Sequence, residues 1–290
     1  MKTLIIDSNN LIHRTFWTAK KQSQRTQTDT PEQLSNFHIY FTLNAIFSYT
    51  QKFQPTQVIC VWDEKPDYRR NERKTLFTEY KGNRSNNITP HQNNEAIKKL
   101  LSCLGIKSIF PRELEADDVV AFLCDRLEGK KVIVSVDKDF LQLINSSTTL
   151  YDPIRQDEYN STNFTEKTGW TDTHEWLDAK CLLGDKSDNV PGIHRFGKSK
   201  VKQFRKGEIK LTPEQFDIYK RNLSLFSLDA FYYRPDEEQY YTTQLDTPTN
   251  PDWKQFLEEC NVREFKTFIQ KKDTWHALFF MRGKLQSIFS

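Results

Sequence analysis

Residues 113–140 read ELEADDVVAFLCDRLEGKKVIVSVDKDF and place acidic side chains on both sides of an apolar stretch. Apolar residues from Val119 to Leu127 recur at helical spacing, and Gly129 is placed to end that helix. Lys131–Val136 is rich in β-branched residues, which is typical of a buried parallel strand. The stretch therefore predicts a helix that begins with acids and a strand that ends with acids. These acids are Glu115, Asp117, Asp118, Asp137 and Asp139.

Two further apolar segments also end in an aspartate. The first ten residues, MKTLIIDSNN, predict a short buried strand that ends at Asp7, and Val58–Trp62 predicts a second strand that leads to Asp63. The carboxyl ends of strands in an open α/β sheet border the crevice in which ligands bind. Three strands that each end in Asp are hard to attribute to chance. We therefore expect an α/β fold with a central, mostly parallel sheet and a site at its edge.

Other elements are predicted from helix caps and apolar spacing. Two capping boxes with proline at the first helical position predict helices over about Thr30–Phe53 and Thr89–Leu104. Ile106–Phe110 is a third strand candidate. Lys20–Thr30 is polar, so we expect it to form a loop. These segments fit the α/β interpretation.

Charge is unevenly distributed along the chain, although the formal net charge is only +3. Lys65–Arg84 contains seven basic residues and three acids, and His194–Lys210 contains seven basic residues and one acid. Asp229–Glu264 contains nine acids and three basic residues. Such blocks indicate one side that binds phosphate and another, acidic side that faces solvent.

The cysteines and the hydropathy pattern indicate a cytoplasmic protein. The five cysteines form no C-x-x-C pair and lie mostly in apolar surroundings, so we expect buried free thiols in a reducing compartment. No apolar run approaches the ~18 residues of a membrane span, and the N-terminus lacks the pattern of a signal peptide. We therefore expect neither membrane insertion nor secretion.

The segment that follows Asp63 is basic and has little apolar periodicity. A connection of this length inside a compact domain is usually functional or disordered. Its basic residues alternate with Tyr68, Phe77 and Tyr80, which fits a surface that follows a nucleic-acid backbone and stacks on bases. A solvated, charged loop is the alternative interpretation.

A second informative stretch, residues 184–204, reads GDKSDNVPGIHRFGKSKVKQF. Asp185 and Asp188 are three residues apart, so on a helical turn both would face the same way. A glycine-containing turn then leads into a basic helix, and backbone amides at such a helix start bind phosphate well. The candidate phosphate-binding residues are Gly192, Gly197, Lys198, Lys200 and Lys202.

The acids singled out above form a set of nine candidate metal ligands. They are Asp7, Asp63, Glu115, Asp117, Asp118, Asp137, Asp139, Asp185 and Asp188. Oxygen ligands without a His or Cys pattern select Mg²⁺ or Mn²⁺ over zinc. Nine carboxylates exceed what one ion needs, so we expect two ions, an arrangement that hydrolyses phosphodiesters. Acids at a helix start also complement the helix dipole, which would explain one or two of them without a metal.

The order of these motifs resembles the 5′-nuclease family of flap endonucleases and 5′→3′ exonucleases, which includes the nuclease domain of bacterial DNA polymerase I. The shared motifs are N-x-L-x-x-R-x-F after the first Asp, D-x-x-x-x-x-R before Y-K-G-N-R, E-A-D-D, V-D-K-D-F and G-D-K-S-D-N-V-P-G-I. The match covers roughly residues 1–225 in order. The compact length and a Y-K-x-N-L-x-L stretch are similar to phage members, such as the phage ribonuclease H.

The resemblance implies a fold and a division of the chain. It implies a PIN-like α/β core over residues 1–183, with a helical arch over 64–90, and a helix-hairpin-helix subdomain with a C-terminal extension over 184–290. One metal would be held by Asp7, Asp63, Asp117 and Asp118 with Glu115 nearby. The second would lie toward Asp137, Asp139, Asp185 and Asp188.

The resemblance also implies roles for the arch and the hairpin. Lys81 and Arg84 would contact the scissile phosphate and act in catalysis with Asp7 and Asp139. Tyr80 would stack near the displaced base, and Arg69 and Arg70 would bind nucleic acid. The Gly192–Gly197 hairpin would grip duplex phosphates and bind K⁺ through backbone carbonyls. Arg195 stands where the family has another glycine, which puts that K⁺ site in question.

The implied activity is a structure-specific, Mg²⁺-dependent 5′ nuclease that acts at 5′ flaps, nicks and RNA-primed ends during DNA replication. Its partners would be duplex DNA, RNA–DNA hybrid and replication proteins, and the chain would be a monomer. One alternative is a non-catalytic DNA-binding module, against which the intact acids argue. A phosphatase or a PIN-type ribonuclease is another, but neither would need the basic hairpin after Asp188.

Overall fold

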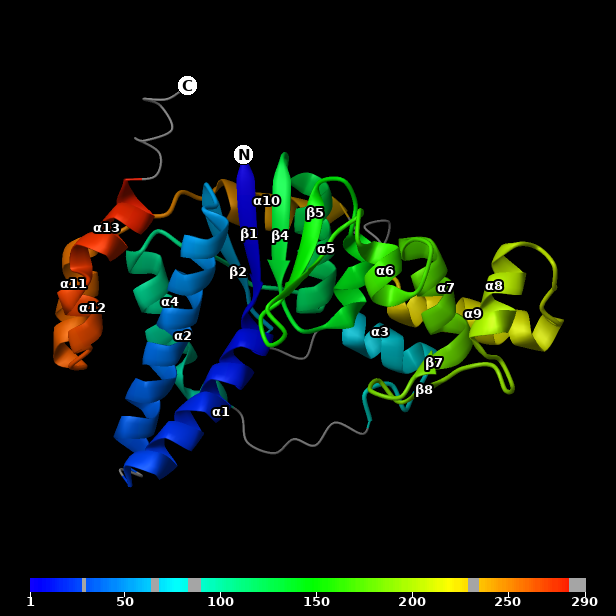
Figure 1. Cartoon of the computed structure of the whole chain (residues 1–290), viewed down its shortest axis with the longest axis horizontal. Coiled ribbons are helices and arrows are strands. Elements are labelled where there is room, and N and C mark those ends of the chain that lie inside the picture. Colours follow the sequence, from blue (N-terminus) through cyan, green and yellow to red (C-terminus); the bar gives the residue numbers. More distant parts are fainter. Residues whose placement is uncertain (28–29, 64–67, 83–89, 229–234, 282–290) are drawn as a thin grey trace.

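The computed structural model describes residues 1–27, 30–63, 68–82, 90–228 and 235–281. In this part of the chain, six strands form a sheet of order β3-β2-β1-β4-β5-β6, with helices on both faces (Figure 1). Strands β1 to β5 run parallel, and β6 pairs antiparallel with β5. The strands are β1 (Lys2–Asp7), β2 (Gln57–Val61), β3 (Lys107–Ile109), β4 (Lys130–Val134), β5 (Thr148–Asp152) and β6 (Asp157–Tyr159). The predicted mostly parallel sheet is confirmed.

The central strands are apolar on both faces because helices cover both sides of the sheet. Leu4 and Ile6 of β1 face one hydrophobic core, and Ile5 faces the other. The first core is formed with α1 (Ser8–Thr26), α2 (Pro31–Phe53) and α4 (Asn94–Cys103). The second core is formed with α5 (Ala116–Arg126), the 3₁₀ helix η2 (Lys138–Leu143), α6 (Phe164–Thr168) and α7 (Thr173–Leu183).

The expected loop over Lys20–Thr30 is wrong for most of its length, because α1 continues to Thr26. Ala19 and Ser23 are fully buried, and α1 packs along α2 as an antiparallel hairpin (Figure 1). Packing against α2 therefore extends a helix whose own sequence is polar. The predicted helix over Thr30–Phe53 is confirmed, and the Thr30 side chain accepts a hydrogen bond from the Gln33 amide.

The next predicted helix begins later than expected. A 3₁₀ turn, η1 (Pro90–Asn93), precedes α4, and Thr89 lies outside the described residues. Within the basic segment, residues 68–76 form α3 (Tyr68–Leu76), which contacts α9 (Pro213–Phe226). The described part of this segment is therefore a helix followed by a turn.

The stretch after α7 forms a small hairpin that projects from the core beside α3 (Figure 1). It contains β7 (Gly184–Asp185) and β8 (Val190–Pro191), and it leads to α8 (Lys198–Arg205). Gly184 has φ +76°, and a Cβ there would lie 2.2 Å from the Gly192 amide nitrogen. The two glycines therefore let the strands of this hairpin approach closely.

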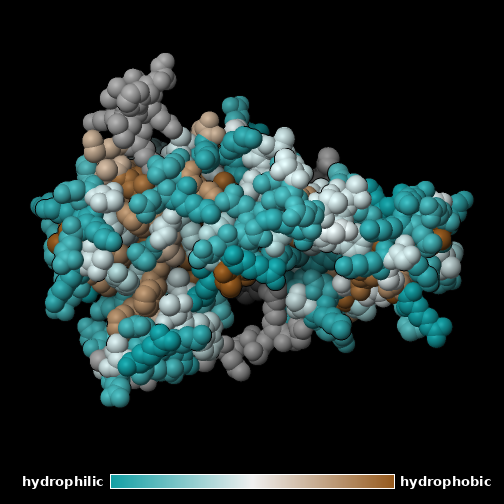
Figure 2. Space-filling view, in the orientation of Figure 1, coloured by the Kyte–Doolittle hydropathy of each residue, from teal (hydrophilic) through white to brown (hydrophobic). Residues whose placement is uncertain are grey.

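The C-terminal helices pack on the core instead of on α8 and α9. They are α10 (Pro235–Asp246), α11 (Trp253–Val262), α12 (Lys266–Gln270) and α13 (Lys272–Phe280). Phe268 stacks on Tyr40 of α2, and Trp275 stacks on Phe47 of α2. Figure 2 shows a band of apolar atoms that follows α2. The part of residues 184–290 that was predicted to be a C-terminal extension therefore packs on the core through α2.

The cysteines and the apolar character of the helices were considered in the sequence. All five cysteines are buried and free, as expected. Among the helices that the structure describes, none is both long and apolar enough to cross a membrane.

Candidate active site

Three of the predicted acids lie where adjacent strands of the sheet end. Asp7 ends β1, and Asp63 and Asp137 follow the neighbouring strands β2 and β4. Asp7 Oδ1 accepts a hydrogen bond from the Asn10 amide at 3.1 Å and so caps α1. Its Oδ2 accepts a hydrogen bond from Ser135 Oγ at 2.7 Å. The end of β4 therefore fixes the orientation of the first carboxylate.

The start of α5 brings a second group of acids to the same edge. Glu115 is the N-cap of α5, and its amide donates to Asp118 Oδ2 at 3.3 Å in a capping box. Glu115 is only 2% exposed, and Asp118 is also buried. Capping thus accounts for the local geometry of these two acids.

The remaining acids come from η2 and from the hairpin. Asp137 caps η2, with its Oδ1 accepting from the Asp139 amide at 2.8 Å. Asp185 Oδ1 accepts from the Ser187 amide at 2.7 Å, and Asp188 is buried. Five separate parts of the chain therefore supply the nine acids that the sequence singles out.

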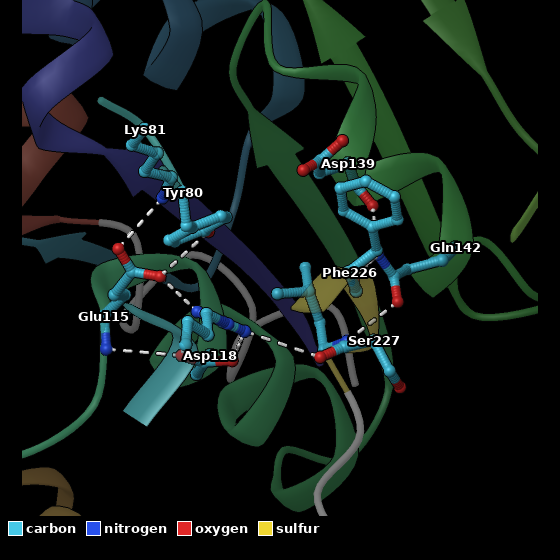
Figure 3. A network of polar contacts seen from close by, with 10 residues as sticks. Tyr80, Lys81, Glu115, Asp118, Asp139, Gln142, Phe226 and Ser227 are labelled. Atoms are coloured by element: carbon cyan, nitrogen blue, oxygen red, sulfur yellow. Dashed lines mark hydrogen bonds and ion pairs between the residues drawn. The ribbon is translucent and has the colours of Figure 1, made fainter. Parts of the chain in front are cut away.

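Buried cations neutralise the Glu115 side of the site. Arg73 of α3 is 1% exposed and donates to both oxygens of Asp118, at 2.8 and 3.1 Å, and to Glu115. Lys81 Nζ lies 2.9 Å from Glu115 Oε1. Burial opposes a charged ammonium, but Glu115 raises the pKa of Lys81 above its usual value. Figure 3 shows Lys81 and Tyr80 directed at Glu115, with Asp139 on another side of the site.

A different cation neutralises the Asp139 side. Lys180 of α7 forms ion pairs with Asp139 and, at 2.9 Å, with Asp185. Burial raises the pKa of Asp139 to about 6 in spite of this pair. Burial would also raise the pKa of Asp185, but Lys180 and Ser187 lower it to about 2. Asp185 therefore stays charged at a lower pH than Asp139, because Asp139 is more deeply buried and Ser187 donates hydrogen bonds to Asp185.

The acids between these two sides have raised pKa values. Burial raises the pKa of Asp7, and the charge of Asp63 adds to the effect. Burial and then the charge of Asp137 hold the pKa of Asp117 well above its usual range. Burial also raises the pKa of Asp137, with contributions from Asp7 and Asp188. These mutual effects show that acids distant in sequence lie close together.

The donor set fits a hard divalent cation, although the side chains are not arranged around one point. Among the described residues, no group of three or more His, Cys, Asp or Glu side chains is positioned to hold an ion. Lysine and arginine side chains instead pair with four of the acids, Glu115, Asp118, Asp139 and Asp185. A cation would offset the burial and the mutual repulsion that raise the pKa of the central aspartates, and all the donors are oxygens.

The expected arch residues differ in what the structure shows of them. The Lys81 amide donates to the Asp188 carbonyl at 2.9 Å, which ties this segment to the hairpin. Tyr80 is 3% exposed and packs in an apolar cluster with Phe226, so its ring is not presented for base stacking. The side chains of Arg69 and Arg70 lie outside the described residues, as does Arg84.

The helix that follows the hairpin, α8, exposes its lysines to solvent. Lys198, Lys200 and Lys202 are exposed on α8, and Gly197 is the N-cap of that helix. Gly192 lies at the close approach described above. Arg195 has φ +56°, so this turn adopts a left-handed conformation that glycine would adopt at lower cost. The turn thus keeps a glycine-like backbone in spite of the substitution.

Sequence reasoning missed the two buried cations Arg73 and Lys180. Arg73 lies in the basic segment, where its neighbours Arg69, Arg70 and Lys74 carry the same charge. Lys180 lies five residues before Asp185, in a helix that ends at the hairpin. That proximity to a candidate ligand was the available signal for Lys180.

Comparison with known proteins places the chain among nucleases. Residues 2–169 match the family model "5'-3' exonuclease, N-terminal resolvase-like domain". A 5'-3' exonuclease of Aquifex aeolicus is 31% identical over 202 residues, which are 68% of this chain and 66% of that protein. The flap endonuclease Xni of Psychromonas ingrahamii is 32% identical over 199 residues, 67% of this chain and 72% of that protein.

Other relatives are longer or more distant. DNA polymerase I of Lactococcus lactis is 30% identical over 208 residues, and the matched part is only 23% of that protein. The crystal structure of the T5 D15 protein has a TM-score of 0.65 at 18% identity, covering 85% of this chain and 99% of that chain, which shows a shared fold. The family model and the relatives of similar length agree with the motifs along the sheet edge. The chain belongs to the 5′-3′ exonuclease family of nucleases.

Proposed function

We propose that this chain is a structure-specific, metal-dependent 5′ nuclease that hydrolyses phosphodiester bonds at 5′ flaps, nicks and RNA-primed ends. The observation that carries this proposal is the gathering of buried acids from the ends of adjacent strands, the start of α5 and the hairpin. Lys81, from a basic segment, reaches the same cluster. Exposed lysines on α8, the helix that follows the hairpin, support a DNA substrate.

The proposed cofactors are two Mg²⁺ ions, for which Mn²⁺ would substitute. One ion would be held by Asp7, Asp63, Asp117 and Asp118 with Glu115 nearby, and the other by Asp137, Asp139, Asp185 and Asp188. When bound, such ions activate water and neutralise charge on the phosphate. The raised pKa values of the central aspartates support this assignment, because acids without a cation resist ionisation.

The side chains of the protein would bind and orient the substrate. Lys81 would lie beside the scissile phosphate and stabilise the charge that develops there, and Arg84 would share this role. The exposed lysines of α8 would bind phosphates of the downstream duplex. Backbone carbonyls of the hairpin would bind K⁺, and the φ of +56° at Arg195, which a glycine would adopt readily, is compatible with this proposal.

The relatives support the same substrate class. Proteins of similar length in the family are named as 5'-3' exonucleases or as the flap endonuclease Xni. A variant of the T5 D15 flap endonuclease, which shares the fold with a TM-score of 0.63, has been crystallised with DNA and metal ions. These names fit a chain that cleaves branched DNA.

Mapping of cleavage sites tests the proposal. The purified chain is incubated with 5′-labelled flap, nicked and RNA-primed duplexes and with single-stranded RNA, with Mg²⁺ or with EDTA. We expect Mg²⁺-dependent cuts near the junction, and we expect Asp117→Asn to lose cleavage by at least about 10²-fold while it still binds DNA. Cleavage of single-stranded RNA alone would favour a PIN-type ribonuclease. Binding of every duplex without cleavage by the wild type would favour a non-catalytic module.

A further inference from the structure

A groove of about 370 Å³ runs along the first half of α1, and none of the nine candidate metal ligands lines it. One face of α1 lines it with Asn10, Arg14, Trp17 and Lys21, which recur at helical spacing. The opposite wall includes Val136 and Ile154. The groove therefore lies between α1 and the ends of β4 and β5.

The inner end of the groove adjoins the carboxylate cluster. The Asn10 amide donates to Asp7, and Val136 immediately precedes Asp137. Trp17 lies seven residues beyond Asn10, roughly 10 Å along the helix axis. If the carboxylate cluster is the place of cleavage, as proposed, a nucleotide bound in the groove would be next to the cleaved bond.

The groove contains apolar side chains that folding leaves exposed. Trp17 is 43% exposed and Ile154 is 66% exposed. A single exposed apolar residue needs no explanation, but these two line the same hollow. In Figure 2, a small apolar area stands among hydrophilic atoms where the turn between β5 and β6 crosses the start of α1 in Figure 1.

The surroundings of Trp17 are cationic. Lys20 Nζ lies 5.1 Å from the centre of the indole ring. Arg14 and Lys21 line the groove on either side of it. An exposed aromatic ring with basic neighbours is the arrangement by which proteins stack a base and bind its phosphate.

We propose that this groove binds an unpaired nucleobase of the nucleic-acid substrate, stacked on Trp17 beside Ile154, adjacent to the cleaved phosphodiester. This inference rests on the proposed function, because it takes the carboxylate cluster as the place of cleavage. It gives the molecule a base-stacking residue at a position other than Tyr80, whose ring is buried. Stacking would be tolerant of sequence, since every base has an aromatic face.

A fluorescent base tests the inference without cleavage. 2-Aminopurine is placed in turn at each position around the junction of a flap duplex, and the complex is formed in EDTA or Ca²⁺. For the wild type, we expect quenching at one or two adjacent positions. Trp17→Ala should abolish that quenching and weaken binding about tenfold, whereas Trp17→Phe should keep most of both.

The controls separate this inference from the proposed function. Ile154→Ala should give a smaller loss of affinity, and Val262→Ala, at an 82% exposed position on α11, should give none. Equal quenching by the wild type and Trp17→Ala at every position, with cleavage intact, would overturn the stacking site alone. Failure of the wild type to bind or cleave any duplex would overturn the proposed function. Equal melting temperatures of the variants would show that each change is local.

Discussion

The two sides of the carboxylate cluster balance their negative charge in different ways. On the Glu115 side, the cations are Arg73 and Lys81, which come from residues 68–82, outside the sheet and its covering helices. On the Asp139 side, the cation is Lys180, which belongs to α7 of the core. The ion pairs of Arg73 and Lys81 hold residues 68–82 against the core. The ion pairs of Lys180 instead neutralise acids beside α7, a helix that already packs in the core.

The acids between the two sides show what this difference means for the site. Asp7, Asp117 and Asp137 have raised pKa values, although arginine and lysine lie on both sides of them. Burial is the main cause and the charges of neighbouring acids add to it, so divalent ions bound at the centre, as proposed, would favour the charged forms of these acids. The protein cations stabilise the flanks of the cluster and, on the Glu115 side, also position the basic segment.

Removal of Arg73 should have the largest effect on folding. Arg73→Ala removes the guanidinium partner of two buried carboxylates, Asp118 and Glu115. The loss should lower the free energy of unfolding by about 3–5 kcal/mol. Arg126→Ala is the matched control, because Arg126 pairs with Glu238 at the surface. That change should cost less than about 1 kcal/mol. Similar losses in urea denaturation for both variants would show that α3 is not held by this pair.

Lys81→Ala should lower turnover more than it lowers stability or duplex affinity. Arg73 still pairs with Glu115 in this variant, so we expect the fold to be kept, but the positive charge that we propose lies beside the scissile phosphate is lost. We expect kcat to fall about 10²- to 10³-fold. Lys99→Ala is the control, since Lys99 pairs with Glu259 in an exposed position. Equal losses of affinity and turnover in single-turnover assays would argue that Lys81 only binds DNA.

The positions of the acids could be predicted because each one lies beside a strong local signal. Apolar strands that end in Asp7, Asp63 and Asp137 indicate one sheet edge, and the order of the strands then brings these residues together. The α5 acids were likewise predictable, because a carboxylate N-cap followed by an apolar helical face is visible in the sequence. Periodicity and strand-end chemistry were sufficient for this part of the site.

The partners of the acids depend on contacts between distant segments, which the sequence does not display. Arg73 is buried because α3 packs between the core and α9, while nothing in its local sequence distinguishes it from the exposed Lys74. Tyr80 was predicted to stack on a base because it lies in a basic segment. It is instead buried beside Cys181 and Phe226. In both cases tertiary packing decides which member of a basic, aromatic segment faces inward.

A pH-dependent experiment on the Asp139 side addresses the smallest of these effects. Burial raises the pKa of Asp139 from 3.8 to about 6 in the folded protein. The stability gained by protonating this carboxyl is therefore fully present below pH 3.8, and it is lost as the pH rises through about 6. Asp139→Asn removes that titration while it keeps the size of the side chain. In EDTA, the melting temperature of the variant relative to the wild type should increase between pH 4.5 and 7.5.

The variant must be compared with the wild type at each pH, because protonation of His38 lowers the stability of both proteins in acid. Burial lowers the pKa of His38 to about 4, so acid favours the unfolded state through this group in both proteins, and the difference between them cancels it. Mg²⁺ should reverse the trend at pH 7.5, since an ion that binds charged Asp139 stabilises the wild type more than the variant. A difference in melting temperature that stays constant across the series would mean that Lys180 fully compensates the charge of Asp139. Cations of the protein would then neutralise the acids equally well on both sides of the cluster. The difference between residues 68–82 and α7 would affect only the stability of the fold.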